Sequence, residues 1–324
     1  MSAEYHYGDV VRQVGNGNIG IIKNQGATSP GRRPDGAPAK RLAFDVCLMI
    51  PLREEFDYAR EILRFGKPIS DDGYFLHPFV VPGSSVRGMA VVLFEMGLTS
   101  SAVAATRLLS SHEIRVLAVV GIAGALTPKL RLGDVVVASS VEEYLYGAKV
   151  SALTGRGFEF ELGGLAWQSP PELVSYANNF RYLEDTGAGF SSWRERARSR
   201  RDPGLDTVTS ALANDYPDYL VGAIATGDIV SAAGSFAQWL RRTNRFRAAI
   251  EMEAGGAARA AYGDRRARLM VVRGISDFAD ERKRKLDADL GAWRRYAMHN
   301  AVDLFAALVS SPEFPWRTTT GDPW

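Results

Sequence analysis

Two carboxylates near the C-terminal end of the chain stand where apolar strands are expected to end. Glu253 closes the segment 250–253 (IEME), and Asp277 closes the segment 271–277 (VVRGISD). Open α/β sheets assemble their ligand sites at the carboxyl ends of strands. A carboxylate pair suits cleavage of a ribose–base bond, because the sugar becomes electron-poor and the base leaves as an anion unless an acid protonates it. One carboxylate can hold the ribose hydroxyls while the other supplies that proton.

Each of these residues also has a purely structural explanation. Ser276 or Asp277 can cap the turn that follows the strand, and Glu253 can be a solvated charge at a strand end. Glu251 points to the same face of the strand as Glu253, and we assign it no catalytic role. Met252, between them, is placed to pack under the sugar, so all three residues are expected to lie at the substrate.

A second polar segment, 97–101 (GLTSS), follows the expected strand 90–95 and opens a helix. Backbone N–H groups at such a helix start can lie near a ribose or an anion, which makes Gly97, Thr99 and Ser100 candidate binding residues. Thr99 or Ser100 is also expected to cap the helix.

Apolar segments alternate with helical ones from Phe44 onward, which predicts an α/β protein whose sheet is covered on both faces. The expected strands are 44–50, 90–95, 116–120, 133–139, 221–226, 247–252 and 269–274. The expected helices include 53–64, 100–112, 254–263 and 287–309. Apolar residues at helical spacing from Leu290 to Leu308 indicate that the last helix belongs to the core.

Composition sets the class of protein. With 324 residues, 46% of them hydrophobic and 23% charged, the chain can bury a large core. A net charge of +2 implies no general attraction to nucleic acid or to a membrane. The single cysteine, Cys47, lies in an apolar run and is expected in the core of a cytosolic protein. We find neither a secretion signal nor an apolar run of about 20 residues, and therefore expect a soluble, cytoplasmic protein.

The first forty residues form a separate piece, expected to be a β-hairpin followed by a linker. Its segment 15–20 (GNGNIG) matches the G-x-G-x-x-G dinucleotide fingerprint. That fingerprint requires a helix next, whereas 21–26 is strand-like, so a hairpin turn or an arm that packs on a neighbouring subunit is favoured.

A variable insertion is expected at about 147–220, where periodicity weakens and arginines gather between 194 and 201. Within it, the Ser-x-x-Glu signature at 169–172 predicts a capped helix near 171–182. Basic runs elsewhere, such as 282–285, are interrupted by acidic residues and are typical of solvated helix faces. A less favoured interpretation is that some of these cations bind the 5′-phosphates of a nucleotide.

Three ordered motifs resemble the nucleoside phosphorylase/nucleosidase superfamily: 251–254 (EMEA), 273–277 (RGISD) and 121–126 (GIAGAL) with 133–137 (GDVVV). The similarity is greatest to the methylthioadenosine/adenosylhomocysteine nucleosidases. The resemblance implies a three-layer fold with a central mixed β-sheet flanked by helices. It implies a catalytic domain over 41–312, preceded by the 1–40 arm and followed by a 313–324 tail. It further implies a homo-oligomer.

The resemblance also implies roles for residues. Asp277, next to Ser276, would be the acid that faces N7 of a purine, and Glu55, in the triplet Arg53-Glu54-Glu55, would orient and deprotonate the attacking water. An acidic residue in the first turn of a helix is also favoured by the helix dipole alone.

The segment 226–230 (TGDIV) resembles the loop that covers the base, but Ile229 and Val230 stand where the nucleosidases have a stacking aromatic. Phe236 or Tyr146 is expected to compensate for it.

The segment 121–124 distinguishes two reactions. Phosphorylases of this superfamily place an arginine and a serine around its first glycine, whereas this chain has Val119 and Ile122, with Gly124 beyond. Neither side chain can donate a hydrogen bond to phosphate, so water is the favoured nucleophile. The alternative is that Arg87, Arg107 or an arginine of the insertion supplies an anion site.

The sequence thus predicts a hydrolase that cleaves the N-glycosidic bond of a purine nucleoside or nucleotide, with adenine favoured, and that needs no cofactor and no metal. The arm and the arginine-rich insertion resemble those of effector proteins in defence systems that act on nucleotides such as AMP or ATP. Two alternatives stay open: a phosphate-dependent phosphorylase, and a non-catalytic sensor that binds a nucleoside or nucleotide.

Overall fold

The chain divides into two compact units, Met1–Lys40 and Arg41–Trp324. The structure, a computed structural model, describes residues 10–14, 18–22, 41–71, 73–152, 158–161, 163–184, 187, 189–202, 211–264, 267–288 and 291–316.

In the first unit, β1 (Val10–Val14) and β2 (Asn18–Ile22) pair as an antiparallel hairpin. A strand therefore stands where the dinucleotide fingerprint would require a helix. The fingerprint residues Gly15, Asn16 and Gly17 themselves lie outside the described residues.

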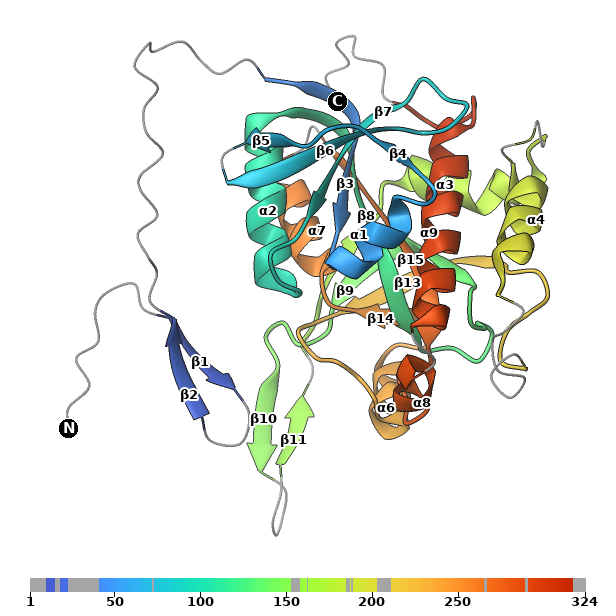
Figure 1. Cartoon of the computed structure of the whole chain (residues 1–324). Helices are drawn as coiled ribbons and strands as arrows, with labels where there is room; N and C mark the ends of the chain where they lie inside the picture. Colours follow the sequence, from blue (N-terminus) through green and yellow to red (C-terminus); the bar gives the residue numbers. More distant parts are fainter. Residues whose placement is uncertain are drawn as a thin grey trace, which may run out of the picture. The chain divides into compact units, whose positions relative to one another are not determined.

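The second unit is built on one large mixed sheet (Figure 1). Its strands are β3 (Ala43–Ile50), β4 (Arg64–Phe65), β6 (Tyr74–Val80), β7 (Arg87–Val92), β8 (Glu113–Ala125), β9 (Val135–Glu143), β12 (Leu165–Gln168), β13 (Tyr219–Thr226), β14 (Arg247–Glu251) and β15 (Arg268–Asp277). They follow the order β12-β9-β13-β14-β8-β3-β7-β6-β4, and β15 pairs with β8 and β9. Strand β3 is parallel to β7 and β8, whereas β14 is antiparallel to β8, so the predicted mixed sheet is confirmed. Three short strands complete the set: β5 (Ile69–Asp71) beside β6, and the separate pair β10 (Lys149–Ala152) and β11 (Phe158–Glu161).

Helices cover both faces of the sheet, which gives the predicted three layers (Figure 1). They are α1 (Arg53–Ala59), α2 (Leu98–Ser111), α3 (Pro171–Asn179), the 3₁₀ turn η1 (Phe180–Tyr182), α4 (Phe190–Arg200), α6 (Gly234–Thr243), α7 (Ala254–Gly263), α8 (Lys283–Ala288) and α9 (Ala292–Ser310). Helices α2 and α7 pack together on one face, and α9 covers the other with α1 and α4 beside it. Val46, Leu48 and Ile50 of β3 join the core under α9, while Cys47 and Met49 join the core under α2 and α7. A strand buried on both faces explains the continuous apolar run in the sequence.

The predicted cap of α2 is wrong. Gly97 occupies the N-cap position with φ 110°, and the side chain of Asp228 accepts the N–H of Leu98 at 2.8 Å. Neither Thr99 nor Ser100 caps the helix, because an anionic side chain from a distant loop already binds one of its first N–H groups.

Three other local predictions need correction. Helix α3 begins where expected, but the hydroxyl of Ser169 donates to the carbonyl of Ala138 at 2.8 Å instead of capping. The helix predicted over 287–309 is divided into α8 and α9, with Gly291 at φ 71° before α9. The helix predicted over 53–64 ends at Ala59. None of the helices in the described part combines the length and the apolar character that a membrane crossing needs.

Candidate active site

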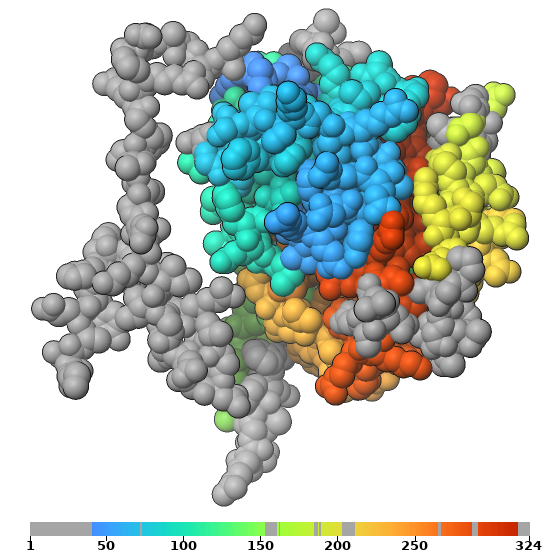
Figure 2. Space-filling model, viewed as in Figure 1, coloured from blue at the N-terminus to red at the C-terminus, as the bar shows by residue number. Residues whose placement is uncertain are grey.

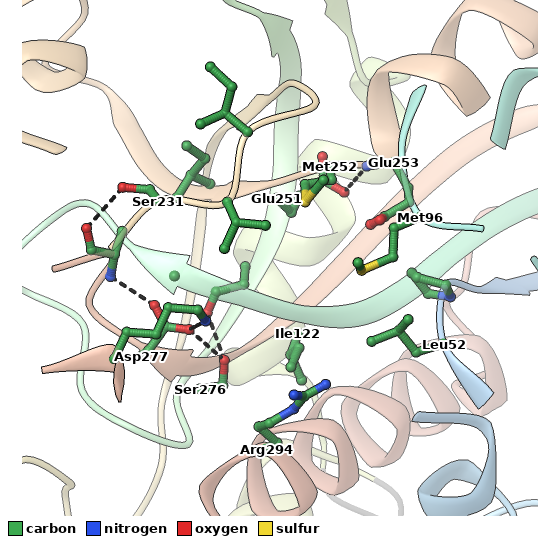
Figure 3. Close-up of a pocket in the computed structure, with 18 of the residues that line it drawn as sticks. Leu52, Met96, Ile122, Ser231, Glu251, Met252, Glu253, Ser276, Asp277 and Arg294 are labelled. Atoms are coloured by element: carbon green, nitrogen blue, oxygen red, sulfur yellow. Dashed lines mark hydrogen bonds and ion pairs between the residues drawn. The ribbon is translucent and has the colours of Figure 1, made fainter. Parts of the chain in front are cut away.

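A cavity of about 350 Å³ lies at the edge of the sheet where β8, β14 and β15 end. Glu55, Glu253 and Asp277, the three carboxylates singled out in the sequence, all line it. It is also lined by the predicted binding residues Ile122, Gly124, Ile229, Val230, Glu251, Met252 and Ser276 (Figure 3). The structure therefore brings together side chains from widely separated parts of the chain.

The topology explains this convergence. Strands β3, β8 and β15 run parallel, so their carboxyl ends meet at one edge of the sheet. Glu55 lies in the first turn of α1 directly after β3, and Asp277 is the last residue of β15. Strand β14 meets the end of β8 from the opposite direction, with Ile250 paired to Gly124, and this places Glu253 at the start of α7 beside the same cavity.

The predicted residues Gly97, Thr99 and Ser100 line an adjoining cavity of about 430 Å³. The two cavities share Met96 and Met252. The segment that opens α2 therefore lies next to the carboxylates, not among them.

A buried arginine sits behind the carboxylates. Arg273 of β15 is 1% exposed, and its Nη2 contacts Oε2 of Glu251 and lies 3.1 Å from Oε2 of Glu253. Burial lowers the pKa of Arg273, but the charges of Glu251, Glu253 and Glu55 outweigh this and raise it above its ordinary value. The guanidinium therefore holds its proton and serves as the shared cation of three acidic side chains.

Glu251 has a structural role in this arrangement. Its carboxylate accepts the backbone N–H of Glu253 at 3.0 Å and of Ala254 at 2.9 Å, in addition to its contact with Arg273. The first N–H groups of α7 are thus satisfied, and the negative charge lies at the positive end of the helix. Glu251 fixes the segment from which Glu253 extends.

Gly121 makes room for the buried cluster. A Cβ at this position would collide with Nη1 of Arg273 and would lie 3.0 Å from Oε2 of Glu55. The first glycine of the motif 121–124 is therefore required by a close side-chain approach.

Burial raises the pKa values of two of the carboxylates toward neutral pH. Glu55 is 3% exposed, and burial raises its pKa to about 8, although Arg273 acts in the opposite direction. Burial likewise raises the pKa of Glu253 to about 7 against the effect of Arg273. Oε2 of Glu55 is buried and has no hydrogen-bond partner among the residues that the structure describes. Both groups can therefore exchange protons near neutrality, as general acid–base chemistry requires.

Asp277 both caps a turn and lines the cavity. Oδ1 accepts the backbone N–H of Ala279 at 2.8 Å, so the residue does cap the turn after β15. Oδ2 lies 3.1 Å from the hydroxyl of Ser276 and 2.6 Å from Nζ of Lys283. The carboxylate still lines the cavity, where a substrate can reach it.

Two cations of the cavity were not predicted. Lys283 belongs to a run that the sequence suggested to be a solvated helix face, and Arg294 lies on α9, where it pairs with Glu54 at 2.9 Å. Both side chains line the cavity. Only the fold identifies them, because their positions depend on the turns that precede α8 and α9.

The loop residues 229 and 230 at the cavity are aliphatic. Ile229 and Val230 line the cavity, and none of the described residues around it is aromatic. The expected compensation by Phe236 or Tyr146 is wrong, because Phe236 packs against Tyr144 and Trp239, and Tyr146 packs against Arg259.

The arginines proposed as an alternative anion site also lie elsewhere. Arg87 pairs with Asp45, and Arg107 lies over the ring of Tyr74. Helix α4 of the insertion lies beside α9 of the core (Figure 2). Arg196 and Arg200 of α4 both pair with Asp303 of α9. None of these arginines lines the cavity, and those of α4 attach the insertion to the core.

Comparison with solved structures finds proteins of similar fold. The 5′-methylthioadenosine/S-adenosylhomocysteine nucleosidase of Neisseria meningitidis, solved with methylthio-immucillin-A, is 18% identical, with a TM-score of 0.58 over 82% of this chain and 98% of that chain. The nucleosidase of Colwellia psychrerythraea, solved with adenine, is 19% identical, with a TM-score of 0.58 over 83% and 96%. The futalosine hydrolase of Helicobacter pylori is 16% identical, with a TM-score of 0.57 over 82% and 97%. This chain therefore has the fold of these nucleosidases.

The family model of the phosphorylase superfamily matches residues 77–310, well over half of the 324 residues. Together with the mixed sheet and the carboxylates at its edge, this match establishes that the chain belongs to the phosphorylase superfamily.

Proposed function

We propose that the protein hydrolyses the N-glycosidic bond of a purine nucleoside or nucleotide and releases the free base. The observation that carries this proposal is the convergence of Glu55, Glu253 and Asp277 on one cavity. A volume of about 350 Å³ lies within the range of small-molecule sites. The three carboxylates suit the three parts of the reaction: the sugar, the water and the leaving base.

Glu253 suits the ribose. Arg273 fixes Oε2, and Oε1 receives only a long hydrogen bond of 3.4 Å from the N–H of Gly97. The carboxylate can therefore accept sugar hydroxyls and stabilise the positive charge that develops on the ring as the bond breaks.

Glu55 suits the water. Its Oε2 has no hydrogen-bond partner, and a pKa of about 8 lets it take up a proton near neutral pH. A base whose pKa lies close to the ambient pH is effective at removing a proton from an attacking water. Asp277 and Ser276 line the same cavity, and we assign them to the leaving base.

Water is favoured over phosphate by the charges around the cavity. Val119 is fully buried, and Ile122 offers no side-chain donor. Lys283, one cation of the cavity wall, is paired with Asp277. A phosphate ion acting as the nucleophile would have to approach the sugar beside the carboxylates of Glu55 and Glu253, which disfavours an anion at that position.

We infer that adenine is the base, because relatives of the same fold were solved with adenine or with an immucillin-A. The arginines of the insertion do not line the cavity, whereas Arg294 does. We therefore assign the binding of a 5′-phosphate to Arg294. Its side chain is 27% exposed, and its Nε is buried with no hydrogen-bond partner in the described part of the chain. This supports a nucleotide substrate. The homo-oligomer and the role in defence stay predictions from the resemblance.

The test is a product assay on the purified protein. Adenosine, methylthioadenosine, AMP and ATP are each incubated with the protein, with and without phosphate, and free adenine is followed by chromatography. We expect adenine and free ribose or ribose phosphate without added phosphate. Glu253→Gln is the matched control, because it keeps the shape of the side chain and removes its charge.

Each outcome decides between the functions. A strict requirement for phosphate, with a 1-phosphorylated sugar as product, would identify a phosphorylase. Tight binding of a nucleoside without release of a base would identify a sensor. Turnover of uncharged nucleosides alone would overturn the nucleotide substrate.

A further inference from the structure

Lys283 is held against the carboxylate that faces the leaving base. It is the first residue of α8, and its Nζ lies 2.6 Å from Oδ2 of Asp277. Its side chain is 23% exposed, whereas that of Asp277 is 5% exposed, so the ammonium group reaches both the buried carboxylate and the solvent. The lysine nitrogen can therefore donate a proton directly to Oδ2 of Asp277.

The turn that carries Lys283 is fixed on two sides. Ala279 has the only positive φ among the described residues other than glycine, 53°, and its N–H binds Asp277 while its carbonyl accepts the hydroxyl of Ser231 at 2.9 Å. Glu281 accepts the N–H of Gly234 at the start of α6, at 3.0 Å. An anchored turn sets where α8 begins, and it thereby sets the position of the lysine.

Building on the proposed function, we propose that Lys283 supplies the proton that leaves with the base and that it acts through Asp277. When the bond between C1′ and the base nitrogen breaks, its electron pair goes to the base. The Nζ proton of Lys283 moves to Oδ2 of Asp277, and Asp277 passes it to the base, which leaves the lysine neutral and Asp277 again a carboxylate. The water oxygen bonds to C1′, and Glu55 takes the water proton. The lysine then regains a proton from the solvent, and Glu55 releases the water proton to the solvent.

This assignment differs from a simple structural ion pair. Because Lys283 acts through Asp277, it is a positioning residue for the reaction, and it matters only when the leaving group needs a proton. A p-nitrophenyl riboside releases a stable anion and needs none. Adenosine or AMP releases a basic purine and does need one.

The experiment compares Lys283→Met and Lys283→Arg with the wild type on the adenine substrate and on p-nitrophenyl β-ribofuranoside. General acid catalysis contributes about 10²- to 10⁴-fold. We expect Lys283→Met to lose about 100-fold or more in kcat on the adenine substrate and less than about threefold on the nitrophenyl riboside. Lys283→Arg keeps the charge beside Asp277 but holds its proton firmly, so it should resemble Lys283→Met. Arg284→Met, an exposed cation of the same helix, is the matched control and should have little effect.

Several results would overturn the proposal. Equal losses on both substrates, or recovery of the purine rate in Lys283→Arg, would mean that the lysine only orients Asp277. A loss on AMP without a loss on adenosine would mean that it binds a phosphate instead. If the wild-type protein releases no base from any riboside, the proposed function itself fails, and that result is distinct from a failure of the lysine variants.

Discussion

Replacing Glu55 by glutamine should make the protein more stable at alkaline pH, although it removes the group that we propose to activate water. Glu55 is buried, and its folded-state pKa of about 8 compares with an ordinary value of 4.5 in the unfolded chain. Between these values the folded protein holds a proton that the unfolded chain has lost. The free energy of unfolding of the wild type therefore falls as the pH rises from about 4.5 to about 8.

The size of the effect follows from the two pKa values. Each pKa unit corresponds to about 1.4 kcal/mol, so the whole difference for Glu55 amounts to about 5 kcal/mol. Glutamine has the shape of the protonated carboxyl group and does not titrate. The variant and the wild type should therefore be similarly stable near about pH 5, and at about pH 8 the variant should be more stable by about 3 to 5 kcal/mol.

Chemical denaturation at a series of pH values, followed by tryptophan fluorescence, measures this difference. Asp57→Asn is the control, because Asp57 is an exposed carboxylate on the same helix and should leave the pH profile unchanged. A weaker pH dependence should persist in Glu55→Gln, because the pKa of Glu253 is raised as well, to about 7. Parallel pH profiles for the wild type and Glu55→Gln would refute the reasoning, since they would mean that folding does not shift the protonation of Glu55.

Three further predictions concern the same cavity. Glu253→Gln should lower kcat by about 10²- to 10³-fold in the adenine-release assay, because the neutral amide no longer stabilises the charge on the sugar. An unchanged kcat would mean that Glu253 takes no part in the reaction. Gly121→Ala should lower the free energy of unfolding by about 1 to 3 kcal/mol, because the added Cβ would collide with the buried guanidinium of Arg273. Denaturant titration measures this free energy, and a variant as stable as the wild type would contradict the prediction. Arg294→Met should lower kcat/KM for AMP by about tenfold or more relative to adenosine, as expected for the loss of a charged contact to phosphate. Equal losses of kcat/KM on AMP and on adenosine would exclude such a contact.

The core strands and the carboxylates could be predicted from the sequence because they obey simple rules. A strand buried on both faces is a continuous apolar run, as in β3, and such runs mark the inner strands of the sheet. The carboxyl ends of the parallel strands share one edge, so Glu55 and Asp277 could be expected to converge before any coordinates were known.

The remaining parts depend on contacts that no local pattern encodes. Strand β6 has exposed positions and contains Pro78, which weakens its strand signal. Lys283 and Arg294 line the cavity because of where α8 and α9 begin, which no local pattern encodes. The run that contains Lys283 suggested a solvated helix face, and the apolar spacing around Arg294 suggested only a core helix. The cap of α2 is supplied by Asp228, which lies 130 residues away from Leu98 in the sequence.

The carboxylate of Glu251 holds the first backbone amides of α7, and it leaves its neighbour Glu253 free to face the cavity. The residue that anchors α7 and the residue at the cavity are thus different side chains, two positions apart. We therefore expect the first turn of α7 to keep its anchor when position 253 is substituted, so that loss of the proposed reaction and loss of the fold are separable.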